Sequence, residues 1–533
     1  MDLKYKICLV IICAAFCSCI TKEKEPAKNA EKPNIIYILA DDLGYGELGA
    51  YGQTKIETPN IDELASRGML FTQHYSGAPV CAPARSVLMT GKHMGHSYIR
   101  GNDEWNTRGE KGDVWNYKKV VKDSTLEGQR PFPKETITIA SLLKNSGYKT
   151  GMFGKWGLGA PHTESIPTKM GFDYFFGYNC QRQAHTYNPV HLYENDLRYH
   201  LTANDTIAPS TKLGKDEDPY ALESYEKYNQ PVYAPEISFE KLISFVDSTK
   251  EAPFFLYWAS PIPHAPLQAP KKWVDHYVEK FGGEEPYSAK YKKGSRNGGY
   301  FPNRYPHATY AAMISYLDEN VGKLVAHLKK IGKYDNTIIM FTSDNGPTYN
   351  GGTDSPWFNS GGPFNSEYGR GKGFLHEGGI RVPMIASWPG KIKAGTTTSH
   401  ISAFWDVMPT LCDIAKIESP KDTDGISFKN TLITGNEENS QREHEYLYWE
   451  YPEYSGQVAV RMGKWKILWK NIKKGNKAIE LYDLDNDLAE TNNIADKHPE
   501  IVENLFEIIK REHKTPENET FIIKELEAIY NTK

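Results

Sequence analysis

The sequence predicts an α/β fold: a doubly wound, mixed but mostly parallel sheet, followed by a small α+β subdomain. Three observations support this prediction. Short apolar runs rich in β-branched and aromatic residues alternate with helical patterns, which is typical of doubly wound sheets. Acidic and amide residues follow directly after several of these runs. Beyond about residue 435, segments of alternating polarity indicate a small antiparallel sheet.

The apolar runs predict strands buried on both faces. The first run, at residues 34–40, reads NIIYILA and contains no charged residue. In a doubly wound fold the ligand site lies beyond the carboxyl ends of such strands. The other predicted strands are residues 253–259, 337–342 and 382–388, and the predicted helices are residues 138–144, 235–247 and 310–330.

The C-terminal part predicts a separate small sheet with a helix packed on it. Residues 445–451 and 458–470 alternate in polarity, and a Met-Gly-Lys turn interrupts the second segment. A helix is expected at residues 499–511. We therefore expect a main domain at 34–435 and a subdomain at 436–533.

The first residues predict export. Two lysines precede an apolar stretch at residues 7–16 that is too short to span a bilayer. The sequence FCSC at 16–19 resembles a bacterial lipobox, although phenylalanine stands where leucine is usual. We expect a signal peptide at 1–18, a lipid anchor at Cys19 on the periplasmic side or the cell surface, and a polar tether at 19–33. Ordinary cleavage with release of the protein is the alternative.

Composition is that of a globular protein without a nucleic-acid partner. The 533 residues are 39% hydrophobic and 24% charged, and the formal net charge is −4. Four of the seven cysteines lie within the first 19 residues. Only Cys81, Cys180 and Cys412 remain, which argues against a disulfide framework and indicates one thiol with another task.

Acidic and amide side chains stand where two predicted strands end. Asp41-Asp42 follows the first strand, and Asp344-Asn345 follows the strand at 337–342. Four converging oxygen donors would suit Ca²⁺ or Mg²⁺ rather than zinc. Each pair alone is also typical of a turn, and Asp424-Gly425 is interpreted as a turn only.

The segment at residues 81–91, CAPARSVLMTG, predicts a helix with a cysteine at its start. Pro83 suits the first helical position and Gly91 suits the residue after the end. Cys81 would then lie at a helix N-terminus, which favours an anion, and Arg85 could reach back to it. For an isolated cysteine, a buried residue beside a helix start is the alternative.

This segment resembles the type I sulfatases of the alkaline phosphatase superfamily, whose signature is C-x-P-[SA]-R-x-x-L-x-T-G. The resemblance implies an alkaline phosphatase-like fold and hydrolysis of a sulfuric ester. It also implies that a maturation enzyme oxidises Cys81 to formylglycine, which is hydrated to a diol. One hydroxyl would attack sulfur and displace the alcohol, and deprotonation of the other would then expel sulfate by C–O cleavage.

Other motifs of the family occur in the same order along the chain. The resemblance implies a calcium ion, with Mg²⁺ less expected, and two lysines that bind sulfate. It implies that a histidine in PHAP serves as general acid. The calcium ligands would be Asp41, Asp42, Cys81, Asp344 and Asn345, and the catalytic residues Cys81, Arg85, Lys155, His264 and Lys372.

One position departs from the pattern. The family usually has histidine in GKWHLG, but here Gly157 stands in that place. That histidine helps to deprotonate the diol. His93, His162, His185 or solvent are the alternatives that could replace it.

The substrate expectation rests on residues 171–185, which resemble a subgroup of bacterial carbohydrate sulfatases. We expect a sulfated glycan with galactose- or N-acetylgalactosamine-configured sugars, cleaved at O4 or O6. A phosphonate or phosphodiester hydrolase and an inactive sulfated-glycan-binding lipoprotein are the rival hypotheses. Candidate sugar contacts, each of which could instead brace a loop, are Arg100, Asn102, Arg182, His185 and His376.

Overall fold

The computed structural model describes residues 32–103, 117–205, 212–249, 252–287, 300–434 and 441–530. Residues 33–533 form one unit. The predicted signal peptide, Cys19 and almost all of the predicted tether lie outside the described residues. Among the described helices, none combines the length and the apolar character that crossing a membrane requires.

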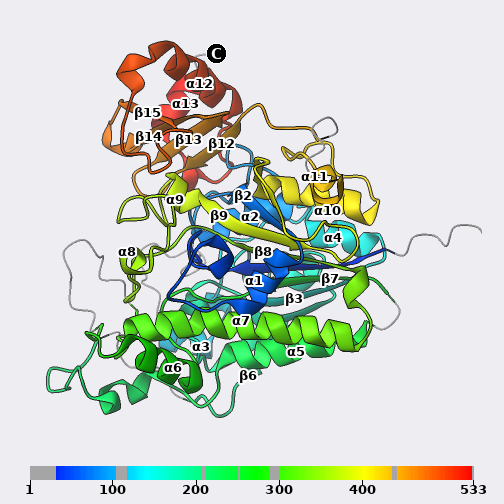
Figure 1. Cartoon of the computed structure of the whole chain (residues 1–533), viewed down its shortest axis with the longest axis vertical. Helices are drawn as coiled ribbons and strands as arrows, with labels where there is room; N and C mark the ends of the chain where they lie inside the picture. The colour runs from blue at the N-terminus through cyan, green and yellow to red at the C-terminus, as the bar shows by residue number, and fades with distance from the viewer. Residues whose placement is uncertain are drawn as a thin grey trace, which may run out of the picture. The chain divides into compact units, whose positions relative to one another are not determined.

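A mixed sheet of eleven described strands forms the centre of the main domain (Figure 1). Its middle is parallel: β1 (Asn34–Ala40) lies between β7 (Phe254–Ala259) and β8 (Thr337–Ser343), and β7 also pairs with β3 (Lys149–Lys155). The strand order is β10-β2-β9-β8-β1-β7-β3-β4-β5-β6, with β11 beside β2. The remaining strands are β2 (Met69–Tyr75), β4 (Tyr174–Tyr178), β5 (His191–Glu194), β6 (Leu197–His200), β9 (Arg381–Ser387), β10 (Thr396–Thr398) and β11 (Ser402–Ala403).

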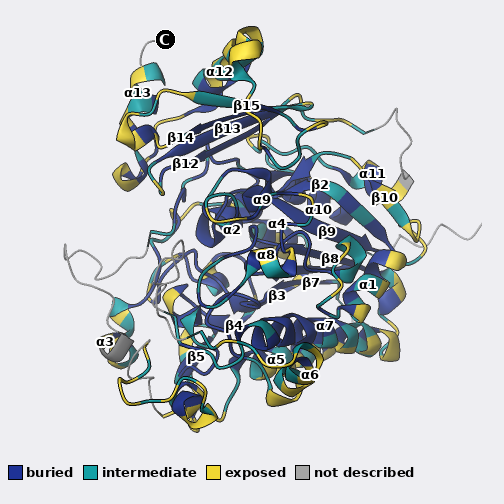
Figure 2. Cartoon of the chain, turned by 60° about the vertical axis from the view of Figure 1, so that its left-hand side comes forward, coloured by how far each residue is buried: buried dark blue, intermediate teal, exposed yellow. Residues whose placement is uncertain are grey.

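Helices cover both faces of this sheet, which confirms the doubly wound fold. Successive side chains of a strand point to opposite faces. Accordingly, Ile35, Tyr37 and Leu39 of β1 belong to one core, and Ile36 and Ile38 to the other. The first core is closed by α2, α4 and α10, and the second by α1, α5, α6 and α7 (Figure 1). Figure 2 shows the central strands buried between the layers and exposed residues on the outer sides of α5 and α6.

The predicted helices and strands of the main domain are confirmed, with shifts of a few residues at their ends. One feature adds to the prediction: β9, expected at 382–388, runs antiparallel to both β8 and β2 and makes the sheet mixed. The helices are α1 (Pro59–Ser66), α2 (Cys81–Thr90), α3 (Tyr117–Lys122), α4 (Ile139–Asn145), α5 (Ala234–Ser248), α6 (Lys271–Phe281), α7 (Pro306–Lys330), α8 (Ser355–Phe358), α9 (Glu377–Ile380), α10 (Val407–Ala415) and α11 (Lys429–Thr434).

The C-terminal part folds as predicted into an antiparallel sheet with helices on one face (Figure 1). Val458, Ile467 and Leu481 of the sheet share a core with Leu505 and Leu526 of the helices. The boundary expected at 435/436 falls among residues outside the described ranges and stays a prediction. The elements are β12 (Leu447–Tyr451), β13 (Gln457–Met462), β14 (Trp465–Lys470), β15 (Ile479–Asp483), α12 (Pro499–Glu512) and α13 (Lys524–Tyr530).

Candidate active site

The carboxyl ends of two neighbouring parallel strands bring the predicted metal ligands together. Asp41 and Asp42 follow β1, and Asp344 and Asn345 follow β8. All four side chains are buried. The Asp42 N–H donates to Asp344 Oδ1 at 3.1 Å, and Asn345 Nδ2 donates to Asp42 Oδ1 at 2.8 Å. The four side chains converge as expected, and their role as ligands stays a prediction.

Two cationic side chains neutralise the carboxylates that face α2, the helix that carries the predicted nucleophile Cys81. Arg85 donates from Nε and Nη2 to Asp344 Oδ2 at 3.1 and 2.9 Å. Lys155, the last residue of β3, donates from Nζ to Asp41 Oδ2 at 2.6 Å. An unpaired buried charge is energetically costly, so these carboxylates can be buried here because Arg85 and Lys155 pair with them.

Cys81 faces the same cluster. Its Sγ lies 3.2 Å from Asp41 Oδ1 and 3.6 Å from Lys372 Nζ. Lys372 Nζ also lies 2.7 Å from Asp42 Oδ1. The two lysines predicted to bind sulfate therefore both lie beside the predicted nucleophile and the acidic cluster.

The helix that carries Cys81 begins earlier than expected. Pro83 is its third residue and not its first, because α2 starts at Cys81. Proline is tolerated there since N–H groups of the first turn have no intrahelical acceptor. Gly91 ends the helix with a φ of 67°, as predicted. Cys81 thus lies at a helix N-terminus, where free N–H groups favour an anion.

Burial and neighbouring charges shift the pKa values of the cluster. Burial, with Asp41 acting in the same direction, raises the pKa of Asp344 to about 6. Burial also raises the pKa of Asp42, whereas Lys155 and other nearby cations outweigh burial and hold the pKa of Asp41 well below its usual range. Burial raises the pKa of the Cys81 thiol, so the unmodified side chain is a neutral thiol at pH 7.

The cluster fits a hard divalent cation. Asn345 Oδ1 is buried and has no hydrogen-bond partner among the described residues, which is costly unless a ligand fills the place. Ligand atoms of Asp41, Asp42, Cys81 and His264 all lie within 4.8 Å of one another. Since oxygen donors predominate once Asn345 is included, the chemistry favours Ca²⁺ over zinc.

His264 lies on the loop after β7 with one ring nitrogen turned to the cluster. Nε2 is 3.7 Å from Asp42 Oδ2, and Nδ1 is 2.6 Å from the carbonyl oxygen of Ala265. Because a carbonyl can only accept, Nδ1 carries the proton and the neutral ring presents Nε2 as an acceptor. Burial lowers the pKa of His264 well below its usual value; Lys372 acts in the same direction and Asp41 opposes it.

Comparison with known families agrees with this arrangement. The model of the family described as Sulfatase matches residues 33–417, which is most of the chain. The chain belongs to the sulfatase family. A second model, described as N-sulphoglucosamine sulphohydrolase, C-terminal, matches residues 367–515 of this sulfatase. The protein is a sulfuric ester hydrolase.

Individual relatives share nearly the whole length of this sulfatase. An N-acetylgalactosamine-6-O-sulfatase of Bacteroides thetaiotaomicron is 30% identical and covers 92% of this chain and 94% of its own. The human N-acetylgalactosamine-6-sulfatase is 28% identical and covers 84% of this chain and 74% of its own. The crystal structure of Ps i-CgsB is 26% identical with a TM-score of 0.69, covering 94% of this chain and 97% of the other.

The Arg100 guanidinium is held by groups of the protein, and its role as a sugar contact stays a prediction. Nε donates to the carbonyl of Ser97, Nη2 to that of Gly95 and Nη1 to that of Lys514, each at 2.9 Å. Nη1 also forms an ion pair with Glu450 of β12. The guanidinium therefore joins the segment after α2 to the C-terminal part.

His376 also lies apart from the cluster. The charges that act on it are those of Lys470, Lys466 and Arg370, and with burial they lower its pKa well below the usual value. Its two ring nitrogens are buried without partners among the described residues. The expectation that His376 contacts substrate stays a prediction.

Two aromatic rings lie beside the general-acid candidate His264 and form a wall with it. His185 stacks on His264 with ring centroids 5.2 Å apart. Tyr300 lies 5.2 Å from His185 and 5.8 Å from His264. Arg182 lies exposed on the short 3₁₀ turn that carries His185. Sequence reasoning missed Tyr300, because no motif marks it. We call His185, His264 and Tyr300 the ring wall.

Of the histidines considered as replacements at position 157, only His185 reaches the site. His93 Nε2 lies 3.2 Å from Glu512 in the C-terminal part. His162 Nε2 pairs with a serine hydroxyl at 2.8 Å on the surface. Neither lies in the cluster around Cys81.

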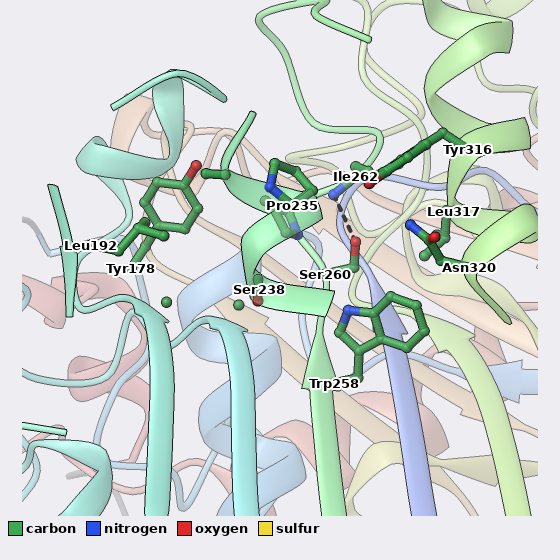
Figure 3. Close-up of a pocket in the computed structure, with 14 residues that line it drawn as sticks. Tyr178, Leu192, Pro235, Ser238, Trp258, Ser260, Ile262, Tyr316, Leu317 and Asn320 are labelled. Atoms are coloured by element: carbon green, nitrogen blue, oxygen red, sulfur yellow. Dashed lines mark hydrogen bonds between the residues drawn. The ribbon is translucent and has the colours of Figure 1, made fainter. Parts of the chain in front are cut away.

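A separate small cavity lies where β3, β4 and β7 end (Figure 3). Its volume of about 10 Å³ admits about one water molecule. Figure 3 shows Trp258 and Ser260 beside Tyr316 and Asn320, and the N–H of Ile262 donates to Ser260 Oγ at 3.2 Å. None of the described residues that line it is a predicted site residue, so this cavity is not the substrate site.

Proposed function

We propose that this sulfatase removes sulfate from O6 of a galactose- or N-acetylgalactosamine-configured sugar. The ring wall is the observation that carries the proposal. It includes His264, beside which the leaving alcohol must lie if His264 donates its proton, and aromatic rings such as the other two suit the apolar face of a sugar. The names of the bacterial and human relatives, both N-acetylgalactosamine-6-sulfatases, favour O6 over O4.

The chain supplies charge for the sulfuryl group from two sides. Lys155 and Lys372 both lie beside Cys81, so their ammonium groups would bind the sulfate oxygens. Arg85 fixes Asp344 and does not face the solvent. Asp41, Asp42, Asp344 and Asn345 would hold the calcium ion, which supplies further positive charge at the sulfate oxygens. Formylglycine made from Cys81 would supply the hydroxyl nucleophile.

His264 must gain a proton before it can donate one. In the substrate-free site, burial and the two lysines keep its ring neutral. A sulfate ester bound between the lysines offsets their charge, so substrate binding favours protonation of Nε2. The proton would then pass to the leaving sugar oxygen, which is too basic to leave as an alkoxide.

A panel of defined substrates tests the proposal. Galactose and N-acetylgalactosamine carrying sulfate at O4 or O6 would be compared with glucosamine 6-sulfate, 4-nitrophenyl sulfate and bis(4-nitrophenyl) phosphate. We expect kcat/KM to be highest for a galactose-configured 6-sulfate. Preference for glucosamine 6-sulfate or for an O4 ester would overturn the sugar assignment. Faster hydrolysis of the phosphodiester would favour the rival hydrolase.

We also infer that the mature protein is exported and lipid-anchored at Cys19. The basic residues, the apolar stretch and the small residue before Cys19 support this inference. Labelled palmitate should appear in the wild type and be absent after Cys19→Ala, and the variant should leave the membrane fraction. An unlabelled wild type would favour ordinary cleavage.

A further inference from the structure

Gly157 has no space for a side chain, because Gln181 occupies the space beside it. The φ of Gly157 is +73°, a conformation that favours glycine. A Cβ added there would come within 2.8 Å of Gln181 Cγ and 3.3 Å of Cδ. Gln181 is 4% exposed, so its amide is a built part of the site rather than a mobile surface group.

Gln181 is the middle of a hydrogen-bonded chain that reaches α2, and it takes part through both its backbone and its side chain. The backbone N–H of Gln181 donates to Gln129 Oε1 at 2.8 Å. Its side-chain Nε2 donates to Asn102 Oδ1 at 3.0 Å. The same oxygen accepts the backbone N–H of Ala82, the residue after Cys81, at 3.1 Å.

Asn102 thereby takes the place of a helix cap. Free N–H groups of a first turn are normally satisfied by the side chain of the N-cap residue. The N-cap of α2 is Val80, which has no polar side chain to offer. Asn102 satisfies the Ala82 N–H from outside the helix, and Gln181 fixes the orientation of the Asn102 amide.

We propose that Gln181 and Asn102 are positioning residues of the sulfatase reaction. Gln181 acts through Asn102, and Asn102 fixes the first turn of α2, which sets the direction in which the residue-81 side chain points. The pair is neutral and does not titrate, so it adds no charge beside the ion pairs of Asp41 and Asp344. This inference rests on membership of the sulfatase family and is independent of which sugar is the substrate.

The test compares Gln181→Met, which keeps the volume over Gly157 and removes the donor, with Asn102→Ala and the double variant. We expect each single change to lower kcat roughly 10- to 100-fold, with KM within about threefold, because a misdirected nucleophile slows chemistry more than binding. The double variant should be no slower than Asn102→Ala, because both act on one turn. The wild type's best sugar sulfate and 4-nitrophenyl sulfate serve as substrates.

A readout without turnover separates this inference from the proposed function. Hydrogen exchange of a peptide spanning the start of α2, followed by mass spectrometry, should be faster at Ala82 in both single variants. The control is Gln183→Met, a buried amide on the same turn that pairs with His191 and should leave kcat and this exchange unchanged. Conversion of Cys81 and thermal stability are measured in every variant.

The proposal would be overturned if a folded Gln181→Met protein, with Cys81 converted to formylglycine, showed unchanged hydrogen exchange at Ala82 and unchanged kcat. A double variant whose loss is the product of the single losses would also overturn it, because the residues would then act separately. If the wild type cleaved none of the sugar sulfates, the sugar proposal would fail, and the exchange result would still decide the positioning role.

Discussion

The Cys81 side chain lies in surroundings that disfavour its thiolate. Burial and the carboxylates of Asp344 and Asp41 raise its pKa, so almost no thiolate exists at pH 7. Cysteine nucleophiles work as thiolates, and their sites lower the pKa with cations or a helix terminus. Here burial and the two carboxylates outweigh the opposing effect of Lys155 and Lys372, which supports the proposal that another group is made from Cys81.

The first prediction concerns this conversion. In active protein the Cys81 peptide should be about 18 Da lighter than the unmodified peptide, because oxygen replaces sulfur and two hydrogens are lost. Peptide mass spectrometry measures it. Cys81→Ser should be folded and inactive, whereas Cys412→Ser, in the core of α10, should keep the activity of its folded fraction. Full activity with unmodified Cys81 would contradict the mechanism.

The second prediction concerns His264 as general acid. His264→Ala should slow hydrolysis of the sugar sulfate roughly 10²- to 10⁴-fold and that of 4-nitrophenyl sulfate far less, because nitrophenolate leaves without a proton. Lys155→Ala should slow both substrates alike, because that charge acts on the sulfuryl group. Steady-state kinetics on both substrates decides the matter. Equal losses for His264→Ala would assign His264 to sulfate binding.

At the scale of elements, the loop after α2 and the end of α12 share a cluster of histidines and carboxylates. Asp424, which the sequence suggested was only part of a turn, accepts from the N–H of His93 at 2.9 Å and lies 2.8 Å from His96 Nδ1. Glu512, at the end of α12, accepts from Tyr446 at 2.6 Å and lies 3.2 Å from His93 Nε2. These contacts attach the C-terminal part to the segment that carries α2.

The third prediction follows from the pKa of Glu512. Burial raises it, but hydrogen bonds from His93 and Tyr446 outweigh burial and hold it at about 2, below the ordinary 4.5. A depressed carboxyl pKa stabilises the fold above pH 4.5, and this contribution is lost as pH falls from 4.5 towards 2. Glu512→Gln should therefore lower the free energy of unfolding by about 1–3 kcal/mol at pH 7.

Urea unfolding at several pH values measures this difference. It should be full at pH 7 and shrink below about pH 4.5. Glu503→Gln, on the exposed side of α12, is the matched control and should change stability by less than about 0.5 kcal/mol. A Glu512→Gln effect that is equally large at pH 3 would show that packing and not charge is responsible.

Elements with a strong pattern could be predicted from the sequence, and elements defined by tertiary contacts could not. β1 and β8 are continuous apolar runs because they are buried on both faces. β3 has the sequence KTGMFGK, and all of its residues but the first are buried. Its lysines and glycines are not typical of a buried strand, so the sequence did not predict it. The ion pair of Arg100 with Glu450 could not be predicted, because the two residues are 350 positions apart in the sequence and no local pattern indicates the contact.

The same limit applies to the site. The nucleophile, the carboxylates and the lysines are marked by family motifs in a fixed order. Tyr300 has no motif, and Gln181 lies in the segment 171–185 without being singled out there; the roles of both depend on which segments the fold places beside them. Among the site residues, only Gly157 could be recognised from the sequence as a departure from the family pattern. The structure adds that Gln181 fills the space beside Gly157.

At the scale of the whole molecule, the site is the point where distant segments meet. Hydrogen bonds and ion pairs link Asp42 to Asp344 and to Lys372, and Lys155 to Asp41, across 114 to 330 residues of sequence. Three buried carboxylates pair with three cations, of which Arg85 and Lys155 are buried and Lys372 is partly exposed. A divalent cation would add two positive charges, which prepares the site for a sulfate anion.

The last prediction is that calcium stabilises the whole fold through these segments. A ligand that binds only the folded state raises stability by about 2.7 kcal/mol at a concentration of 100 Kd. Adding Ca²⁺ to chelator-treated protein should therefore raise Tm by several degrees and restore turnover, and zinc should not replace it. Asn345→Ala, which removes the one buried acceptor of the cluster left unpartnered among the described residues, should lose most of this Tm shift. The exposed Asp485→Ala control should keep it. A Tm that does not respond to calcium, or a full shift in Asn345→Ala, would mean that these side chains do not hold the ion, because a ligand that links β1 to β8 must change the stability of both.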